Sequence, residues 1–371
     1  MNKKRFFVIA ILISVVTSVL LILFTADKDT LDYVLSARLE YIVAAVAVHL
    51  FALYLTSKKT QHLCSAVGCK ISSRNAFFNL ISGLFMAAIT PSSAGGEPIR
   101  VLLLKTGSRI PVGKGTAVII MEKMLDAFFM LLMLIPSFVI VNKYVVKSGV
   151  STDFTNTMLF VSILCVVFVL IILVYVLIKP DGTYKIIEKI VNLIDKITKK
   201  KYEEKLDYVK QRVKGEIKLF YESFKTLIKS GKISLCISFV YTLFSWAIHF
   251  LILWFVLKGL NYTESLVDIF PILCATQILV LIIMLIPATP GASGIAEIGG
   301  YTLFSLFIPG TILAVVVIVW RAITYYINII IGAMANLIVI RKFGFKPFDN
   351  PPDMTKESKS IKIEDSENNK S

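Results

Sequence analysis

Residues 90–98 read Thr-Pro-Ser-Ser-Ala-Gly-Gly-Glu-Pro, and residues 289–297 read Thr-Pro-Gly-Ala-Ser-Gly-Ile-Ala-Glu. Each stretch interrupts a run of apolar residues that resumes on its far side. Proline cannot continue the incoming helix, and glycine allows the chain to turn, in places with a positive φ that other residues avoid. Each stretch therefore predicts a helix that stops inside an apolar segment, turns and starts again, and we expect positive φ at Gly95 and Gly294.

The two breaks occupy the same place in a longer pattern. A histidine inside an apolar run precedes each Thr-Pro pair, His49 by 41 residues and His249 by 40. A charged residue inside an apolar run follows each pair by 32 residues, Glu122 in the first case and Arg321 in the second. We therefore interpret span, broken hairpin and span as one structural unit that the chain uses twice.

The composition places these runs in a membrane. Of the 371 residues, 56% are hydrophobic and 18% are charged, and the mean hydropathy is +0.76. A soluble domain carries about 25% charged residues. The sequence predicts an all-α polytopic membrane protein with six full spans and two re-entrant hairpins, at residues 76–104 and 266–308. The six spans are expected at residues 6–24, 39–57, 116–141, 155–178, 233–257 and 311–340.

Charge determines how the broken segments are oriented. Lys and Arg number 40 against 25 Asp and Glu, and the excess lies in the loops between apolar runs. No nucleic-acid partner is therefore expected. If both broken segments return to the side they came from, 33 basic residues share the side of the amino terminus and five lie opposite. The positive-inside rule favours this arrangement. The sequence therefore predicts a multi-pass plasma-membrane protein with inverted repeats and both termini in the cytoplasm.

Four regions follow from this topology. Two membrane halves, residues 1–178 and 233–345, flank a basic segment at residues 179–232, and a polar tail at 346–371 is expected to be disordered. The basic segment has apolar residues at helical spacing and is expected to form a cytoplasmic amphipathic helical insertion. It would lie on an anionic leaflet, pack under the membrane halves, or form a solvated hairpin.

The motifs resemble a known family. The two glycine-rich breaks ending in Glu97 and Glu297, together with Glu122-x-x-x-Asp126, resemble the lysylphosphatidylglycerol synthase transmembrane region, also called the flippase-like integral membrane family. The resemblance covers about residues 1–345. It implies movement of a lipid with a charged head group between leaflets. Longer members carry an aminoacyltransferase domain after the membrane region, and that activity is not expected here.

Nine residues are candidates for substrate binding or transport. Carboxylates inside spans are costly and usually have a function or a partner. Glycines let the backbone approach a head group, and a guanidinium suits a lipid phosphate. The candidates are Gly95, Gly96, Glu97, Glu122, Asp126, Gly291, Gly294, Glu297 and Arg321.

Each charged candidate also has a structural interpretation. Glu97 and Glu297 would contact substrate or protons, or would cap the helices that start beside them. Glu122 and Asp126 stand one turn apart and would form a relay or cation site, or would pair with Lys123 and Arg321 to hold spans together.

Three functional hypotheses remain open. The first is a lipid translocator, the second a membrane enzyme with Glu97 and Glu297 as acid and base, and the third a scaffold that recruits a partner through residues 179–232. The sequence contains no nucleotide-binding loop, nucleophile elbow or metal-ligand spacing, and no cofactor is expected. Membrane lipids are the expected partners, and a homo-oligomer is left open.

The predicted topology can be checked by cysteine labelling. Single cysteines at Lys199 and Asn261, in a background without the five native cysteines, should react with impermeant thiol reagents from opposite faces of the membrane, because the charge distribution places them on opposite sides. Labelling of both positions from one face would contradict the inverted repeats.

Overall fold

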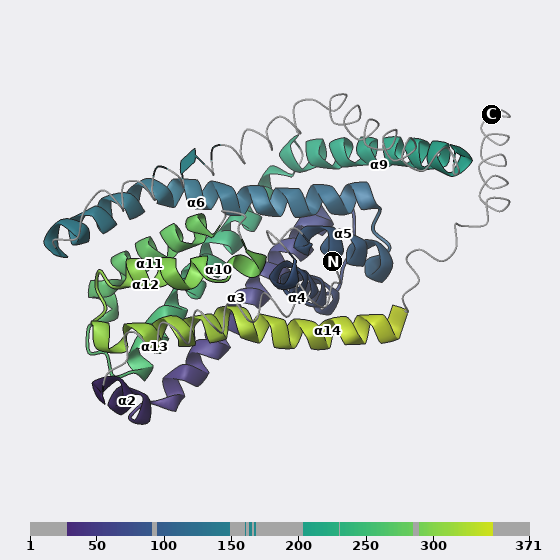
Figure 1. Cartoon of the computed structure of the whole chain (residues 1–371). Helices are drawn as coiled ribbons and strands as arrows, with labels where there is room; N and C mark the ends of the chain where they lie inside the picture. The colour runs from purple at the N-terminus through teal and green to yellow at the C-terminus, as the bar shows by residue number, and fades with distance from the viewer. Residues whose placement is uncertain are drawn as a thin grey trace, which may run out of the picture.

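The computed structural model describes residues 28–90, 95–148, 203–229, 231–284 and 289–343, with four isolated positions between 160 and 167. These residues form helices and contain no strand, so the all-α polytopic fold is confirmed (Figure 1). Three expected elements lie outside the described residues, in whole or almost so: the spans at 6–24 and 155–178, and the tail at 346–371.

Five described helices are long and apolar enough to cross a membrane. Four correspond to expected full spans, and the fifth, α11, is the incoming arm of the second broken segment. They are α3 (Leu39–Ala66), α6 (Val112–Ser148), α10 (Lys232–Gly259), α11 (Leu266–Ile283) and the continuous rod of α13 (Gly310–Arg321) and α14 (Ile327–Phe343).

The first broken segment is a helical hairpin. Helix α4 (Ser73–Ile89) is capped by Ser72, whose side chain accepts a hydrogen bond from the backbone N–H of Asn75. Helix α5 (Gly96–Ser108) folds back along it. The Asn79 side chain donates to the Arg100 carbonyl oxygen at 2.7 Å. Because Asn79 lies in the middle of α4 and Arg100 in α5, the two short helices are antiparallel neighbours, as predicted.

The second broken segment also turns back. Helix α11 is followed by a short turn at Pro290–Ala292 and by α12 (Ile295–Phe304). At the open end of this hairpin, the Tyr262 hydroxyl, just before α11, donates to the carbonyl oxygen of Phe307, just after α12, at 2.9 Å. The incoming and outgoing ends therefore meet, and the segment enters and leaves on one side of the molecule.

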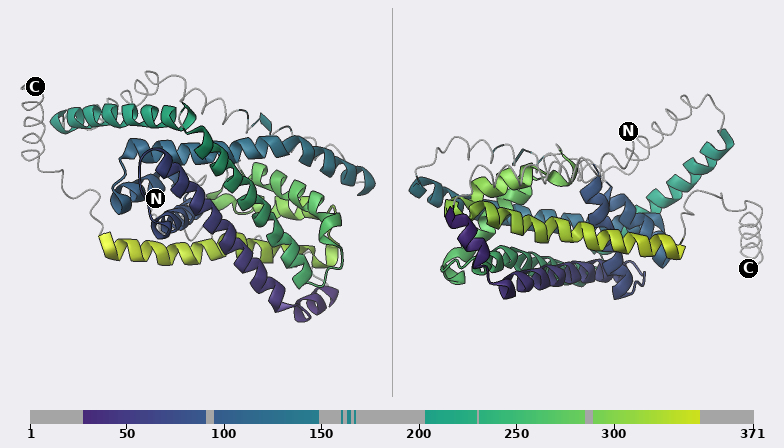
Figure 2. Two further views of the ribbon diagram at one scale, coloured as in Figure 1. Left: turned by 180° about the vertical axis from the view of Figure 1, so that it is seen from behind. Right: turned by 60° about the horizontal axis from the view of Figure 1, so that its bottom comes forward.

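Equivalent helices of the two repeats pack against each other in opposite directions. The backbone N–H of Arg38, at the start of α3, donates to the carbonyl oxygen of Gly259, at the end of α10, at 2.8 Å. Near the middle, the rings of His49 and His249 have centroids 5.8 Å apart. Contact between equivalent residues is expected at a pseudo-two-fold axis, and Figure 2 shows the two helices side by side. This antiparallel packing is what an inverted repeat predicts.

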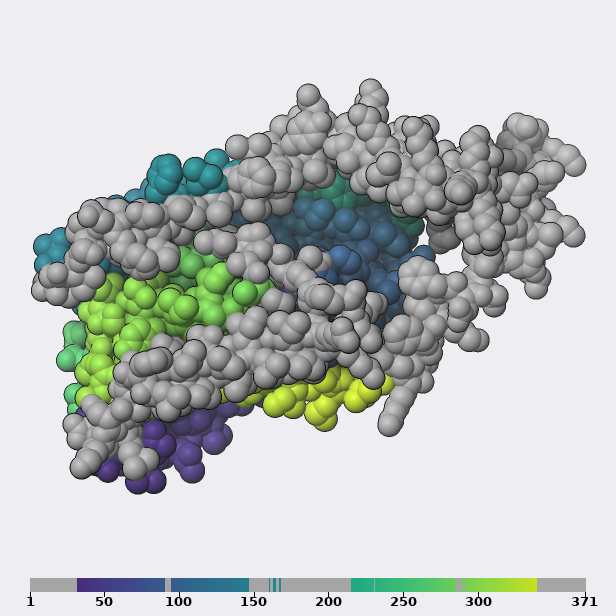
Figure 3. Space-filling model, in the orientation of Figure 1, coloured from purple at the N-terminus to yellow at the C-terminus, as the bar shows by residue number. Residues whose placement is uncertain are grey.

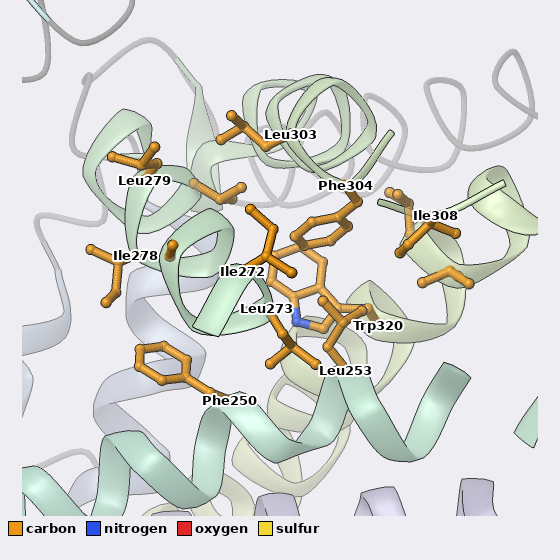
Figure 4. Close-up of a cluster of buried hydrophobic side chains, with 14 of the residues drawn as sticks. Phe250, Leu253, Ile272, Leu273, Ile278, Leu279, Leu303, Phe304, Ile308 and Trp320 are labelled. Carbon is orange, nitrogen blue, oxygen red and sulfur yellow. The ribbon is translucent and has the colours of Figure 1, made fainter. Parts of the chain in front are cut away.

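The second membrane half has the larger apolar core. Figure 4 shows side chains from α10, α11, α12 and α13 converging on one cluster, with Trp320 and Phe304 at its centre. These two rings meet edge to face with centroids 5.5 Å apart. In Figure 3, α14 lies along the lower side of the molecule. Its side chains Ile330 and Met334 are 59% and 60% exposed. Such apolar exposure is expected where lipid is the solvent.

A π-helical turn joins α13 to α14. It covers Ala322–Tyr326, directly after Arg321. Such turns are rare and occur frequently at functional sites. Beyond it, Gly332 lies against Phe85 of α4, so α14 contacts the first hairpin.

Part of the basic segment is described as α9 (Glu203–Lys229). The side chains of Phe220, Phe224 and Leu227 are buried in a cluster with residues of α3, α5 and α6. The backbone N–H of Gly113, at the start of α6, donates to the Glu216 carboxylate at 2.6 Å. This end of the segment therefore packs against the membrane helices, whereas residues 179–202 lie outside the described part.

Gly332→Ala should destabilise the protein. A Cβ at this position would lie 2.5 Å from Phe85 Cβ and 2.9 Å from the Ile81 carbonyl oxygen, and overpacking of this kind costs about 1–3 kcal/mol. Gly107→Ala is the matched control, because no described atom lies within 4 Å of its Cβ. Thermal unfolding of the detergent-solubilised protein should show a lower midpoint for Gly332→Ala alone. Equal midpoints would contradict this contact.

Candidate functional site

A cavity of about 250 Å³ lies between the two repeats. Helices α3, α4 and α6 of the first repeat and α10, α11, α13 and α14 of the second line it. Its polar lining includes His49, Glu122, Asp126, His249, Arg321 and Asn328. Glu122 and Arg321, at equivalent places in the repeats, therefore face one cavity, as their register predicts.

Two histidines meet at the centre of the cavity, and His49 forms a hydrogen bond with Asn328 of the other repeat. The Asn328 side-chain amide donates to the Thr324 carbonyl oxygen at 2.6 Å, which leaves the amide oxygen facing His49 Nε2 at 2.9 Å. His49 Nε2 is therefore the donor, and its buried Nδ1 has no hydrogen-bond partner among the described residues. His249 contacts both His49 and Trp246 through its ring. His49 is thus hydrogen-bonded and His249 is packed against it, and both line the cavity.

Glu122 is held by the first hairpin. The Arg100 guanidinium binds both of its carboxylate oxygens, at 2.7 and 2.8 Å, and the Thr60 hydroxyl donates to it at 2.6 Å. Both charged side chains are buried, with 3% and 1% exposed. A bidentate pair of this kind is short, strong and geometrically specific. It fixes α5 and α3 to the side of α6.

Asp126 is held by two other spans. Lys59 Nζ of α3 lies 2.6 Å from its carboxylate, and Trp246 Nε1 of α10 donates to the same oxygen at 3.2 Å. The Lys59 side chain is 1% exposed and that of Asp126 is 19% exposed. Asp126 therefore joins both repeats at the edge of the cavity.

Glu97 forms a more open pair. It lies 3.1 Å from Lys123 Nζ, and the two side chains are 41% and 48% exposed. Lys123 also lines the cavity. Of the ion pairs at the cavity in the described residues, this one has both partners most accessible.

Glu297 is buried at the start of α12. One carboxylate oxygen accepts from the backbone N–H of Gly294 at 2.6 Å, and the other lies 3.1 Å from Arg321 Nε. The Arg321 guanidinium also stacks over the Tyr325 ring, 4.3 Å from its centroid. Glu297 therefore both caps its helix and forms an ion pair. The Tyr325 hydroxyl donates to the Ala88 carbonyl oxygen at 3.3 Å and so ties this group to the end of α4.

The sequence matches a known family of membrane proteins. The profile of a family described as the lysylphosphatidylglycerol synthase TM region matches residues 7–332. The chain belongs to this family. The matched range includes both hairpins and every residue that lines the cavity.

Curated relatives of similar length are membrane proteins. A UPF0104 membrane protein of Archaeoglobus fulgidus is 28% identical over 327 residues, which cover 88% of this chain and 95% of the relative. The UPF0104 membrane protein MJ1595 of Methanocaldococcus jannaschii is 24% identical, over 83% of this chain and 87% of the relative. No solved structure matches. The chain is therefore a multi-pass integral membrane protein of this family.

The charged pairs correct one expectation from the sequence. One of the two interpretations, in which Glu122 and Asp126 pair with Lys123 and Arg321, is wrong. Each charge instead has a partner in its own repeat: Arg100 for Glu122, Lys59 for Asp126, Glu97 for Lys123 and Glu297 for Arg321. In the first repeat of this family member, the short helix carries the cation Arg100. In the second, the short helix carries the anion Glu297. The same joint, between a broken helix and the next span, is thus made twice with the charges exchanged.

The breaks require glycine for different physical reasons. Gly291 and Gly294 have φ of 60° and 84°, in the region that disfavours a side chain. Gly95 has φ of −82°, so the expected positive value there is wrong. Gly95 instead lies against Thr90, where a Cβ would be 2.6 Å from the threonine methyl, and Gly96 lies against Ala87. Approach of these backbones to a head group remains a prediction.

Two cations of the site were missed in the sequence. Lys59 was assigned to a loop because the apolar run ends at Ser57, yet α3 continues to Ala66. Arg100 was overlooked inside the short apolar piece after the first break. The available signal was the cost of Glu122 and Asp126 in a span, which demands cations nearby. Every Lys and Arg next to an apolar run is therefore a candidate partner.

The pairing can be tested with two mutant cycles. Arg100→Gln or Glu122→Gln alone should lower the thermal midpoint sharply, because loss of one partner from a buried pair costs about 3–5 kcal/mol. The double variant should recover most of the loss. Glu122→Gln combined with Arg321→Gln should show additive losses, because the two residues share no partner in the described part. Recovery in this second cycle would contradict the assigned partners.

Proposed function

We propose that the protein is a flippase-like translocator that moves a lipid with a charged head group between leaflets. The observation that carries the proposal is the cavity between two inverted halves, lined by charged and polar groups from both. Inverted repeats with broken helices around a midplane site are characteristic of secondary transporters. Charged groups at that depth usually face a pathway for substrate or ions.

The partly exposed pair of Lys123 and Glu97 supports entry of a head group. An exposed ion pair contributes about 0–1 kcal/mol. A phosphate can therefore replace Glu97 as the partner of Lys123 at little cost in free energy. Arg321 is buried under Glu297 and Tyr325, and a phosphate that reached it would have to displace a carboxylate. Lys123 is therefore the proposed first contact, and Arg321 the deeper cation that faces the cavity.

The antiparallel contact of α3 and α10 supports a simple motion. The two helices meet at His49 and His249, near the pseudo-two-fold axis. In inverted-repeat transporters, access alternates largely by rocking one half against the other around a fixed site. We propose that the halves rock about this contact, in the plasma membrane, with both termini cytoplasmic.

This proposal differs from an enzyme in its chemical outcome. A translocator leaves the lipid covalently unchanged, whereas an enzyme with Glu97 and Glu297 as acid and base would alter it. Both carboxylates are engaged in ion pairs, and Glu297 also binds a helix N-terminus, which supports transport over catalysis. Lipid mass spectrometry before and after a transport assay distinguishes the two.

Thr56→Phe should block transport without breaking an ion pair. Thr56 lines the cavity, and its hydroxyl donates within its own helix, to the Ala52 carbonyl oxygen at 3.1 Å. A phenyl ring there would fill much of the space, and movement of fluorescent phosphatidylglycerol in proteoliposomes should fall about tenfold or more.

Thr106→Phe is the matched control for this variant. Thr106 also donates within its helix, to Leu102 at 3.0 Å, but it is exposed outside the cavity. It should transport at the parental rate. Parental transport by Thr56→Phe, with an unchanged thermal midpoint, would show that this cavity is not the route.

A further inference from the structure

A second hollow, of about 470 Å³, lies at the C-terminal end of α3. It is formed by the last turns of α3, the loop that leads to α4, and Tyr241 of α10. It shares no lining residue with the central cavity. Its lining includes three basic side chains, Lys58, His62 and Lys70, and no carboxylate. Its electrostatic character is therefore cationic.

Some hydrogen-bond donors in this hollow have no partner among the described residues. Lys58 Nζ donates to Ser73 Oγ at 2.7 Å and to Gln61 Oε1 at 3.2 Å, and an ammonium has three donors. Lys70 is exposed and has no hydrogen bond or ion pair among the described residues. His62 Nε2 is shielded from solvent and also lacks a described partner. An anion with several oxygens would bind the remaining donors of Lys58 and Lys70.

Apolar surface leads directly away from the hollow. On α3, Phe51 and Tyr54 are 51% and 41% exposed, and Lys58 Nζ lies 5.3 Å from the centre of the Tyr54 ring. On α10, Val240 and Phe244 flank Tyr241 and are 46% and 60% exposed. Both helices are long and apolar enough to cross a membrane, so we expect these exposed side chains to face the hydrocarbon. The hollow thus lies where a lipid-facing surface reaches the membrane interface.

We propose that this hollow binds the phosphate of an anionic phospholipid, with the acyl chains lying on the exposed faces of α3 and α10. Basic pockets between transmembrane helices on the cytoplasmic side bind anionic head groups, and the charge-derived topology places this end of α3 in the cytoplasm. The site lies outside the central cavity, so it holds a lipid at the rim of the protein and does not depend on the proposed transport route.

The test uses the full-length protein with its central cavity filled by Thr56→Phe. Native mass spectrometry measures binding of short-chain phosphatidylglycerol, short-chain phosphatidylcholine and inorganic phosphate. Lys58→Gln with Lys70→Gln should weaken phosphatidylglycerol binding about thirtyfold, which corresponds to about 1 kcal/mol for each of the two basic residues. Phosphatidylcholine should bind equally to all variants.

Lys225→Gln with Lys229→Gln is the charge-matched control, because both residues are exposed on α9. It should bind phosphatidylglycerol within about twofold of the parent, because neither residue lines the hollow and salt screens exposed charges. An equal loss in the control would overturn the proposal in favour of general surface charge. Inorganic phosphate binding as tightly as the lipid would overturn the assignment to phospholipid. Because transport is not measured, failure of the proposed transport function leaves this result unaffected.

Discussion

Burial of charge inside apolar helices is the constraint on which the architecture depends. Each isolated charge at membrane depth costs about 2.5–3.5 kcal/mol on insertion scales. The described spans contain Lys59, Glu122, Asp126 and Arg321, and each has an oppositely charged partner within 3.1 Å. The pairs of Glu122 and Arg321 form only if the short helices α5 and α12 return to the spans that follow them. The charge pairs therefore hold the hairpins in place.

The exchange of charges between repeats creates a polarised cavity. Glu122 and Arg321 occupy equivalent positions, yet one is an anion and the other a cation, and both line the same space. Each is neutralised from behind, by Arg100 and Glu297 respectively. The two equivalent positions thus place side chains of opposite charge around one cavity.

The sequence revealed the fold at the level of segments. The Thr-Pro breaks, their common register and the distribution of Lys and Arg predicted two inverted hairpins and the cavity shared by Glu122 and Arg321. The ends of helices were harder to predict, because α3 continues past Ser57 and Lys59 has a buried partner in Asp126. Pairing was beyond sequence reasoning, since Arg100 meets Glu122 only after α5 turns back. The same holds for Gly95, whose role depends on contact with Thr90.

The π-helical turn after Arg321 determines the rotation of α14 about its axis, and so which side chains of α14 face each neighbour. A π turn accommodates one residue more than an α-helical turn, and each residue of an α-helix advances about 100° around the axis. Without the extra residue, side chains beyond Tyr326 would rotate by that angle relative to Arg321. Asn328 would then leave His49, and Gly332 would leave Phe85. The insertion of a single residue thus allows one rod to present Arg321 to its own repeat and Asn328 and Gly332 to the other.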